Sequence, residues 1–236
     1  MHERAVVVIP TYNEADNIGA LIQQVLDSAS GISALVVDDA SPDGTGRIVN
    51  DLVAANKKVA VIHRPGKLGL GSAYRAGFRH AISGGFELVL TMDADFSHDP
   101  KVIPELLAGM TDHDVMIGSR YVRGGGTVNW DFRRRLLSHG ANRFAKSLLR
   151  FNTNDNTSGF RCYRRAVLES VRFDEIQSSG YSFLVEILYR CARMGFAIGE
   201  CPITFVDRRF GKSKLSRGEI LQGIKTVFRL RLARRV

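Results

Sequence analysis

The sequence of 236 residues contains no long hydrophobic run and little cysteine. Its longest apolar stretches, at 5–10, 34–37 and 88–90, have the length of β-strands, whereas a membrane-spanning helix needs about 20 apolar residues. No basic and then apolar segment typical of a secretory signal opens the chain. The three cysteines are scattered and lack the spacing of a zinc site. We therefore expect reduced, packed thiols in a cytoplasmic protein.

The charge is distributed unevenly along the chain. Residues 1–100 carry 8 Lys and Arg against 12 Asp and Glu, whereas residues 201–236 carry 10 against 2. The length is typical of one domain with a sizeable core. An acidic first part and a basic end indicate a metal-binding half and a half that faces phosphates or an anionic surface.

Strand-sized and amphipathic segments alternate through the first half of the chain. The segments 5–10, 34–37 and 59–63 are rich in Val and Ile and show no in-out alternation, as expected for strands covered on both faces. This order predicts an α/β fold with a mainly parallel sheet flanked by helices. Helices are predicted at about 15–28, 45–55, 72–83, 100–110, 131–150, 181–194 and 216–235, and further strands at 88–92, 114–118 and 197–206.

Two carboxylates end the predicted strand at 88–92. Asp93 and Asp95 are two residues apart, so in an extended backbone their side chains point to the same side. Open α/β sheets bind ligands at the carboxyl ends of their strands. Two carboxylates suit Mg²⁺ or Mn²⁺, which then also bind substrate phosphates. The alternative interpretation of the segment 93–95 is a polar turn that caps the next helix.

Several polar segments follow other predicted strands. Arg120 is predicted one strand away from the two acids, where it could bind a phosphate or pair with Asp93 or Asp95. The glycine-rich segment 66–71 could contact a phosphate directly, but a structural or helix-start role is favoured slightly. His98 and Glu186 are candidates for an acid or base. The favoured interpretation is that His98 fixes its loop and that Glu186 holds the loop before its helix. Residues 207–214 carry four cations able to close on a diphosphate.

The predicted helices at 131–150 and 216–235 are both basic and amphipathic, with aromatic residues. This composition is typical of helices that lie on a membrane surface. The alternative is an ordinary surface helix whose long cationic side chains reach water.

Six motifs occur in order across nearly the whole chain, and together they resemble a known family. They are 8–14 (VIPTYNE), 36–45 (VVDDASPDGT), 92–98 (MDADFSH), 118–121 (GSRY), 157–161 (TSGFR) and 211–214 (GKSK). In this combination they look like the catalytic domain of dolichol- or polyprenol-phosphate mannose synthases, of inverting glycosyltransferase family 2. The resemblance implies a single GT-A catalytic domain over 1–236, with a nucleotide and metal half to about 120 and an acceptor and membrane-facing half after it.

The resemblance also implies substrates and site residues. It implies a GDP-mannose donor, a polyprenyl or dolichyl monophosphate acceptor, and Mg²⁺ or Mn²⁺. Residues implied to bind the donor are Pro10, Tyr12, Glu14, Val37, Asp39, Asp93, Ala94, Asp95, Arg120, Arg208 and Lys214. The implied acceptor-phosphate residues are Arg120, Arg133, Arg134 and Ser138. The implied metal ligands are Asp93 and Asp95, and these two acids with Arg120 and Arg208 form the implied catalytic set. Ser97 stands where some relatives have Gln, which leaves its role as a ligand open.

The expected chemistry agrees with this composition. A lipid phosphate is already an anionic nucleophile, so the reaction needs stabilisation of the departing diphosphate by a metal and cations rather than a strong base. We expect peripheral contact with an anionic membrane at its cytoplasmic face, directly or through a separate membrane protein. A related transferase that uses UDP-glucose or another nucleotide sugar is the first alternative. A non-enzymatic binder of nucleic acid would leave Asp93 and Asp95 without a role, so we expect no nucleic-acid partner.

Overall fold

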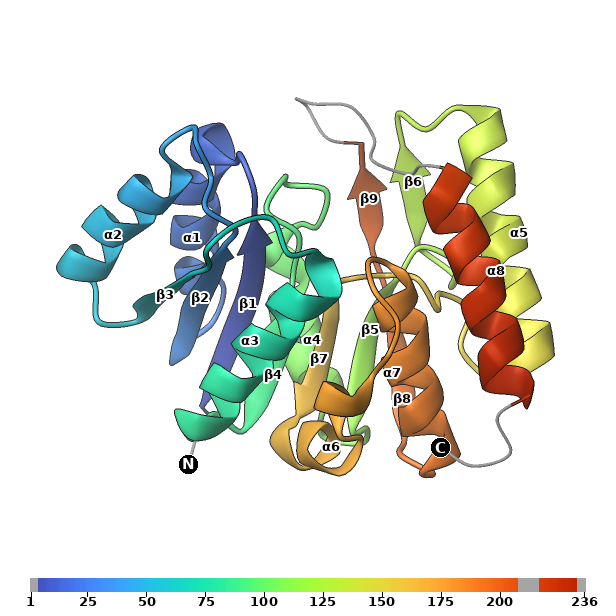
Figure 1. Ribbon diagram of the computed structural model, residues 1–236. Helices are drawn as coiled ribbons and strands as arrows, with labels where there is room; N and C mark the ends of the chain where they lie inside the picture. The colour runs from blue at the N-terminus through green and yellow to red at the C-terminus, as the bar shows by residue number, and fades with distance from the viewer. Residues whose placement is uncertain (1–3, 208–216, 233–236) are drawn as a thin grey trace.

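The computed structural model, which describes residues 4–207 and 217–232, has a seven-stranded sheet between two layers of helices (Figure 1). The spatial order of its strands is β3-β2-β1-β4-β7-β5-β8. Strand β7 is antiparallel to β4 and β5, and the other pairings in this sheet are parallel. The strands are β1 (Ala5–Thr11), β2 (Ile32–Asp38), β3 (Val59–His63), β4 (Leu88–Thr91), β5 (Val115–Ser119), β7 (Arg161–Arg164) and β8 (Ile198–Pro202).

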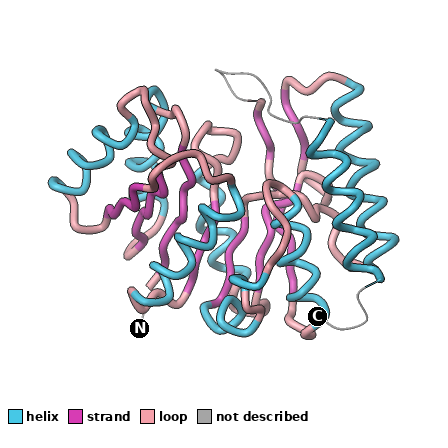
Figure 2. Tube along the Cα trace, viewed as in Figure 1, coloured by secondary structure: helices cyan, strands magenta, loops and turns pink. Residues whose placement is uncertain are grey.

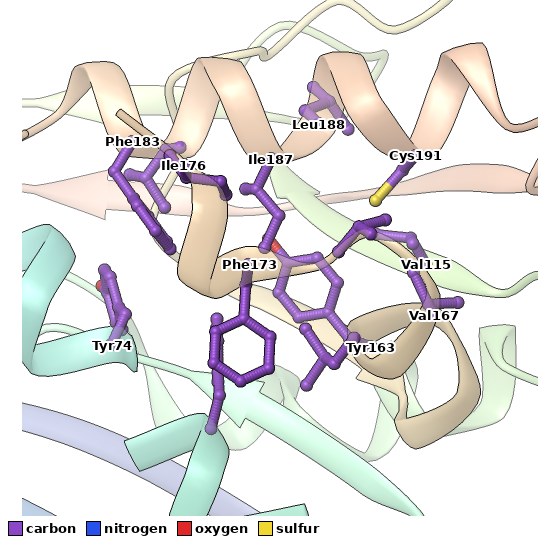
Figure 3. Close-up of a cluster of buried hydrophobic side chains, with 14 of the residues drawn as sticks. Tyr74, Val115, Tyr163, Val167, Phe173, Ile176, Phe183, Ile187, Leu188 and Cys191 are labelled. Atoms are coloured by element: carbon purple, nitrogen blue, oxygen red, sulfur yellow. The ribbon is translucent and has the colours of Figure 1, made fainter. Parts of the chain in front are cut away.

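Both faces of the sheet are covered, which explains the strands without alternation. In β1, Val6 and Val8 belong to one buried cluster, while Val7 and Ile9 belong to the other. Burying one such side chain stabilises the fold by roughly 1.5–3 kcal/mol. The first cluster, part of which Figure 3 shows, includes residues of α3 (Leu70–Ser83), α6 (Arg165–Ser170), the 3₁₀ turn η2 (Phe173–Glu175) and α7 (Ser182–Arg193). The second includes residues of α1 (Ala15–Ser28), α2 (Thr45–Ala55) and α4 (Ile103–Gly109), which follows the 3₁₀ turn η1 (Pro100–Val102).

Two further helices and a small sheet lie at one end of the molecule. Helices α5 (Phe132–Leu149) and α8 (Arg217–Leu232) lie side by side, yellow and red in Figure 1 and visible in Figure 2. The Phe144 and Phe228 rings are in contact with centroids 5.9 Å apart. Strands β6 (Gly126–Val128) and β9 (Thr204–Val206) form a separate parallel pair. Within 4–207 and 217–232, no helix is long and apolar enough to cross a membrane.

The predicted fold class is confirmed, and two details of the prediction are wrong. The late strand at 197–206 is two strands, because the chain leaves the main sheet at Ile203 and joins β6. Strand β7 was not predicted, since four residues with two arginines give little strand signal. Because β7 lies between β4 and β5, Arg120 is two strands away from Asp93 rather than one. Cys162, Cys191 and Cys201 are buried, in agreement with the predicted packing role, and the described residues form no disulfide bond.

Candidate active site

The loops after β1 and β2 are joined by hydrogen bonds at the carboxyl edge of the sheet. The hydroxyl of Thr11 donates to Asp38 Oδ1 at 3.1 Å. The backbone N–H of Asn13 donates to Ser41 Oγ at 3.0 Å, and that of Glu14 to Thr45 Oγ1 at 2.9 Å. The N-cap position of α1, at Glu14, has no side-chain cap hydrogen bond. The second loop instead holds the first one in position.

The structure places five of the residues implied to bind the donor at or beside these strand ends. Val37 and Asp39 are buried, while Pro10, Tyr12 and Glu14 are half-buried. Two residues that the sequence did not assign lie against them. Arg64 pairs with the Asp39 carboxylate, and the ammonium group of Lys67 lies 4.3 Å from the centre of the Tyr12 ring.

The glycine-rich segment has the structural role that was predicted for it. Helix α3 begins at Leu70, directly after Gly69, whose φ of 90° favours glycine. The Leu68 N–H donates to Asp39 Oδ2 at 3.2 Å. The segment therefore both starts α3 and encloses the Asp39 carboxylate.

Asp93 and Asp95 lie in the turn that follows β4. The Asp93 side chain is 27% exposed, whereas Asp95 is buried. Ser97 donates to Asp95 Oδ1 through its hydroxyl at 2.5 Å and its backbone N–H at 3.1 Å. Ser97 thus holds one oxygen of Asp95. Ala94 between the two acids is buried.

His98 is buried next to Asp93 and keeps the turn in place. Its Nδ1 accepts a hydrogen bond from the Asp93 backbone N–H at 3.1 Å. Burial lowers the pKa of His98, although the charges of Asp93 and Asp95 oppose this shift. Its ring stacks on Phe160 at 5.1 Å and meets the edge of Phe205 at 5.4 Å. A neutral, fixed imidazole agrees with the interpretation that His98 fixes its loop.

Arg120 forms its ion pair with Asp155, not with Asp93 or Asp95 as the sequence suggested. Its Nε and one terminal nitrogen each donate to the Asp155 carboxylate at 2.7 Å, and its backbone N–H donates at 3.0 Å. Burial alone would raise the pKa of Asp155, but the Arg120 charge and its hydrogen bonds lower it. The loop between α5 and β7 supplies this partner.

Arg120 and Arg134 share one aromatic ring. Their guanidinium carbons lie 5.5 Å and 4.2 Å from the centre of the Trp130 ring. Arg134 also donates to Asp207 at 2.6 Å. One turn further along α5, Ser138 accepts a hydrogen bond from the Tyr121 hydroxyl at 2.7 Å.

Three of the four predicted acceptor residues therefore contact one aromatic group, made of Tyr121, Trp130 and Phe205. Arg133 is exposed, and the structure does not bring it to this group. Arg208 and Lys214 lie outside the described residues. Trp130, Phe205 and Asp155 were not assigned from the sequence, because no local pattern shows that distant segments meet.

A cleft of about 450 Å³ opens between the segment after β5 and the first turns of α5. Its lining includes the cationic side chains of Arg120 and Arg135 and the apolar side chains of Phe132 and Leu136. A cavity with this mixed lining suits a ligand that has an anionic head and an apolar chain.

Glu186 on α7 has the structural role that was predicted for it. It is buried and accepts hydrogen bonds from the Ser178 N–H at 3.2 Å and the Ser178 hydroxyl at 2.5 Å. It also pairs with Arg190 and with Arg229 of α8. Glu186 therefore joins α8 and the loop before α7 to the core.

The donor set fits a cation that takes few protein ligands. Among the described residues, no group of three or more His, Cys, Asp or Glu side chains could hold a metal ion. The described residues therefore do not form a metal site made of protein ligands alone. Asp93 and Asp95 give a carboxylate pair with one partly exposed member, which suits Mg²⁺ or Mn²⁺ completed by substrate phosphates and water.

Comparisons with known proteins agree with these observations. Residues 6–172 match the family model described as glycosyl transferase family 2. The chain is 42% identical over 232 residues to an undecaprenyl-phosphate mannosyltransferase of Micrococcus luteus, covering 98% of this chain and 96% of that protein. It is also 42% identical over 224 residues to a polyprenol monophosphomannose synthase of Mycolicibacterium smegmatis, covering 94% and 84%.

Solved structures share the fold at low identity. A glucosyl-3-phosphoglycerate synthase of Mycobacterium tuberculosis, in complex with Mn²⁺, UDP and phosphoglyceric acid, superposes with a TM-score of 0.71 at 18% identity, over 98% of this chain and 79% of that one. A mannosyltransferase of Pyrobaculum calidifontis in complex with GDP-mannose and Mn²⁺ gives 0.63 and covers 97% of this chain and 65% of that one.

Proposed function

Because this chain belongs to glycosyltransferase family 2, we propose that it transfers mannose from GDP-mannose to a polyprenyl monophosphate. The observation that carries this proposal is the near full-length identity of 42% to two relatives named for transfer of mannose to such lipids. The site supports it through the carboxylates at one strand end and the arginines on the aromatic group.

The donor side has the parts that a nucleotide diphospho-sugar needs. Tyr12 and Asp39 lie at the ends of adjacent strands and offer a ring face and a carboxylate to a nucleoside. Asp93 and Asp95 would bind Mg²⁺ or Mn²⁺ together with the diphosphate. The bound cation would stabilise the charge that develops on the departing GDP.

The acceptor side suits an amphiphilic phosphate. Arg120 and Arg134 are fixed by Asp155 and Asp207, so they present oriented guanidinium groups to an anion. The neighbouring cleft offers Phe132 and Leu136 to the first prenyl units. The exposed apolar and basic faces of α5 and α8 would contact an anionic membrane at its cytoplasmic face.

The reaction is an in-line displacement with inversion at the anomeric carbon. A phosphate oxygen of the lipid attacks this carbon while the bond to the GDP oxygen breaks, and the electron pair leaves with GDP. The acceptor is already an anion, so the chain needs no strong base. Arg120, Arg134 and the predicted Arg208 and Lys214 would offset the negative charge of the acceptor phosphate and of the departing diphosphate.

A comparison of nucleotides by thermal unfolding tests the donor. GDP with Mn²⁺ should raise the unfolding midpoint more than UDP with Mn²⁺ at equal concentration, because a ligand selective for the native state stabilises it by mass action. GDP without metal serves as the control. A larger shift with UDP would contradict the GDP donor and favour a UDP-sugar.

A further inference from the structure

Three buried or half-buried side chains converge on Gly159, next to Asp93. A Cβ atom on Gly159 would lie 3.3 Å from Tyr74 Oη, 3.5 Å from Asp93 Oδ1 and 3.7 Å from His98 Cε1. The Gly159 carbonyl accepts a hydrogen bond from Thr91 Oγ1 at 2.7 Å. Thr91 ends β4 just before Asp93, so this bond fixes Gly159 relative to the acid.

Tyr74 on α3 brings a polar atom into an apolar cluster. Its ring is fully buried and lies 6.0 Å from that of Phe78 and 6.1 Å from that of Phe183, as Figure 3 illustrates in part. Among the described residues, its hydroxyl has no hydrogen-bond partner. A buried polar group without a partner destabilises the folded state, and Phe would fill the same space without this cost.

Tyr74 can act as a hydrogen-bond donor. A tyrosine hydroxyl, with an ordinary pKa of about 10, carries its proton at neutral pH. The nearby acceptor is Asp93 Oδ1, since both atoms lie close to the same point at Gly159.

We propose that Tyr74 is a positioning residue that donates a hydrogen bond to Asp93 when a divalent cation is bound. The inference rests on the proposed function, because it assigns a cation to Asp93 and Asp95. Ser97 already holds one oxygen of Asp95, and Tyr74 would do the same for Asp93. Partners behind a metal ligand orient it and increase its affinity for the cation.

The test measures Mn²⁺ binding directly, in the presence of saturating GDP, by titration calorimetry. Tyr74→Phe removes only the hydroxyl, and we expect its Mn²⁺ affinity to fall about tenfold. Its unfolding midpoint without metal should stay equal to that of the wild type or rise. The matched control is Tyr163→Phe, which removes an equally buried hydroxyl that bonds to Arg161 at 3.2 Å. This control should keep wild-type Mn²⁺ affinity.

Gly159→Ala provides a second variant that changes the same contact. Its methyl group would lie 3.3 Å from Tyr74 Oη and 3.5 Å from Asp93 Oδ1 and should hinder their approach, so Mn²⁺ affinity should fall as it does in Tyr74→Phe. Wild-type affinity in Tyr74→Phe, or an equal loss in Tyr163→Phe, would overturn the inference while the proposed function stands. A wild type that binds no Mn²⁺ with GDP or UDP would overturn the proposed metal site, and the inference with it.

Discussion

The donor and acceptor sides of this site use similar contacts but offer opposite charges to a ligand. On the donor side, the buried ion pair of Arg64 with Asp39 and hydrogen bonds such as Glu14 N–H to Thr45 Oγ1 hold neighbouring loops together. On the acceptor side, a buried ion pair and a shared aromatic ring fix Arg120 and Arg134. The donor side therefore offers carboxylates for a cation, whereas the acceptor side offers oriented cations for an anion.

The two sides also differ in what they expose. The helices next to the acceptor residues carry large apolar side chains on the surface, with Phe132 70% exposed and Leu232 76% exposed. Others on α5 and α8 are Leu136, Leu137, Phe144, Leu221, Ile224 and Phe228. Exposed apolar groups clustered in this way mark an interaction surface. We propose that the donor arrives from water and the acceptor from a membrane.

Removal of one acid should give the largest effect. We expect Asp95→Ala to reduce kcat/KM for mannose transfer by about 10³-fold, because a bound metal contributes several kcal/mol to the transition state and about 1.4 kcal/mol corresponds to a factor of ten. The matched control is Asp99→Ala in the same segment, which removes an exposed carboxylate that accepts from Lys101 N–H. If Asp95→Ala were as active as the Asp99→Ala control, the assignment of a metal site to Asp95 would be contradicted.

Loss of the buried Arg120–Asp155 ion pair should lower folding stability more than loss of an exposed ion pair. We expect Asp155→Ala to lower the free energy of unfolding at pH 7 by about 3–5 kcal/mol, because it leaves the Arg120 charge buried without its partner. Urea titration measures this change. Asp174→Ala, which breaks the exposed Arg79–Asp174 pair, should cost less than about 1 kcal/mol.

The same pair predicts a dependence on pH. Asp155 has a pKa below its usual value of 3.8 in the folded state, since burial raises it but Arg120 lowers it more. The contribution of ionised Asp155 to the free energy of unfolding is fully present above pH 3.8. It is lost as the pH falls through the lower pKa that Asp155 has in the folded state. The stability difference between wild type and Asp155→Ala should therefore narrow below this pH. A difference that stays constant with pH would contradict the assigned charge.

Variants of the α5 arginines test which face of this helix binds the acceptor phosphate. We expect Arg134→Ser to raise the KM for polyprenyl phosphate about tenfold or more, because a hydrogen bond to a charged group contributes about 1.5–3 kcal/mol. Arg133→Ser is the matched control, since Arg133 neighbours it but is exposed. GDP affinity should be unchanged in both. A larger effect at Arg133 would show that the acceptor phosphate binds on the other face of α5.

The exposed apolar residues should give the smallest effect. Replacement of Phe132 and Leu136 by Ser should weaken binding to anionic vesicles about tenfold in co-sedimentation, because apolar area no longer enters the bilayer boundary. Leu68→Ser removes a side chain that is 58% exposed on the donor side and should leave binding unchanged. Equal loss in both proteins would contradict a membrane contact at α5.

Local patterns predicted the elements of this fold better than its long-range contacts. The uninterrupted apolar runs gave β1 to β5, and Asp93 and Asp95 lie at the end of β4, as their spacing indicated. Strand β7 and the pairing of β6 with β9 join distant parts of the chain, and no periodicity reports such pairings. The partner of Arg120 was missed for the same reason, since Asp155 is 35 residues away.

Sugar transfer from two labelled donors tests the central claim most directly. Purified protein would receive GDP-mannose or UDP-glucose with Mg²⁺ and a short polyprenyl monophosphate in anionic vesicles, with EDTA as a parallel arm. We predict a mannosyl lipid from GDP-mannose, little product from UDP-glucose, and loss of product in EDTA that added Mg²⁺ restores. Faster transfer from UDP-glucose, or full activity of the dialysed protein in EDTA, would contradict the account.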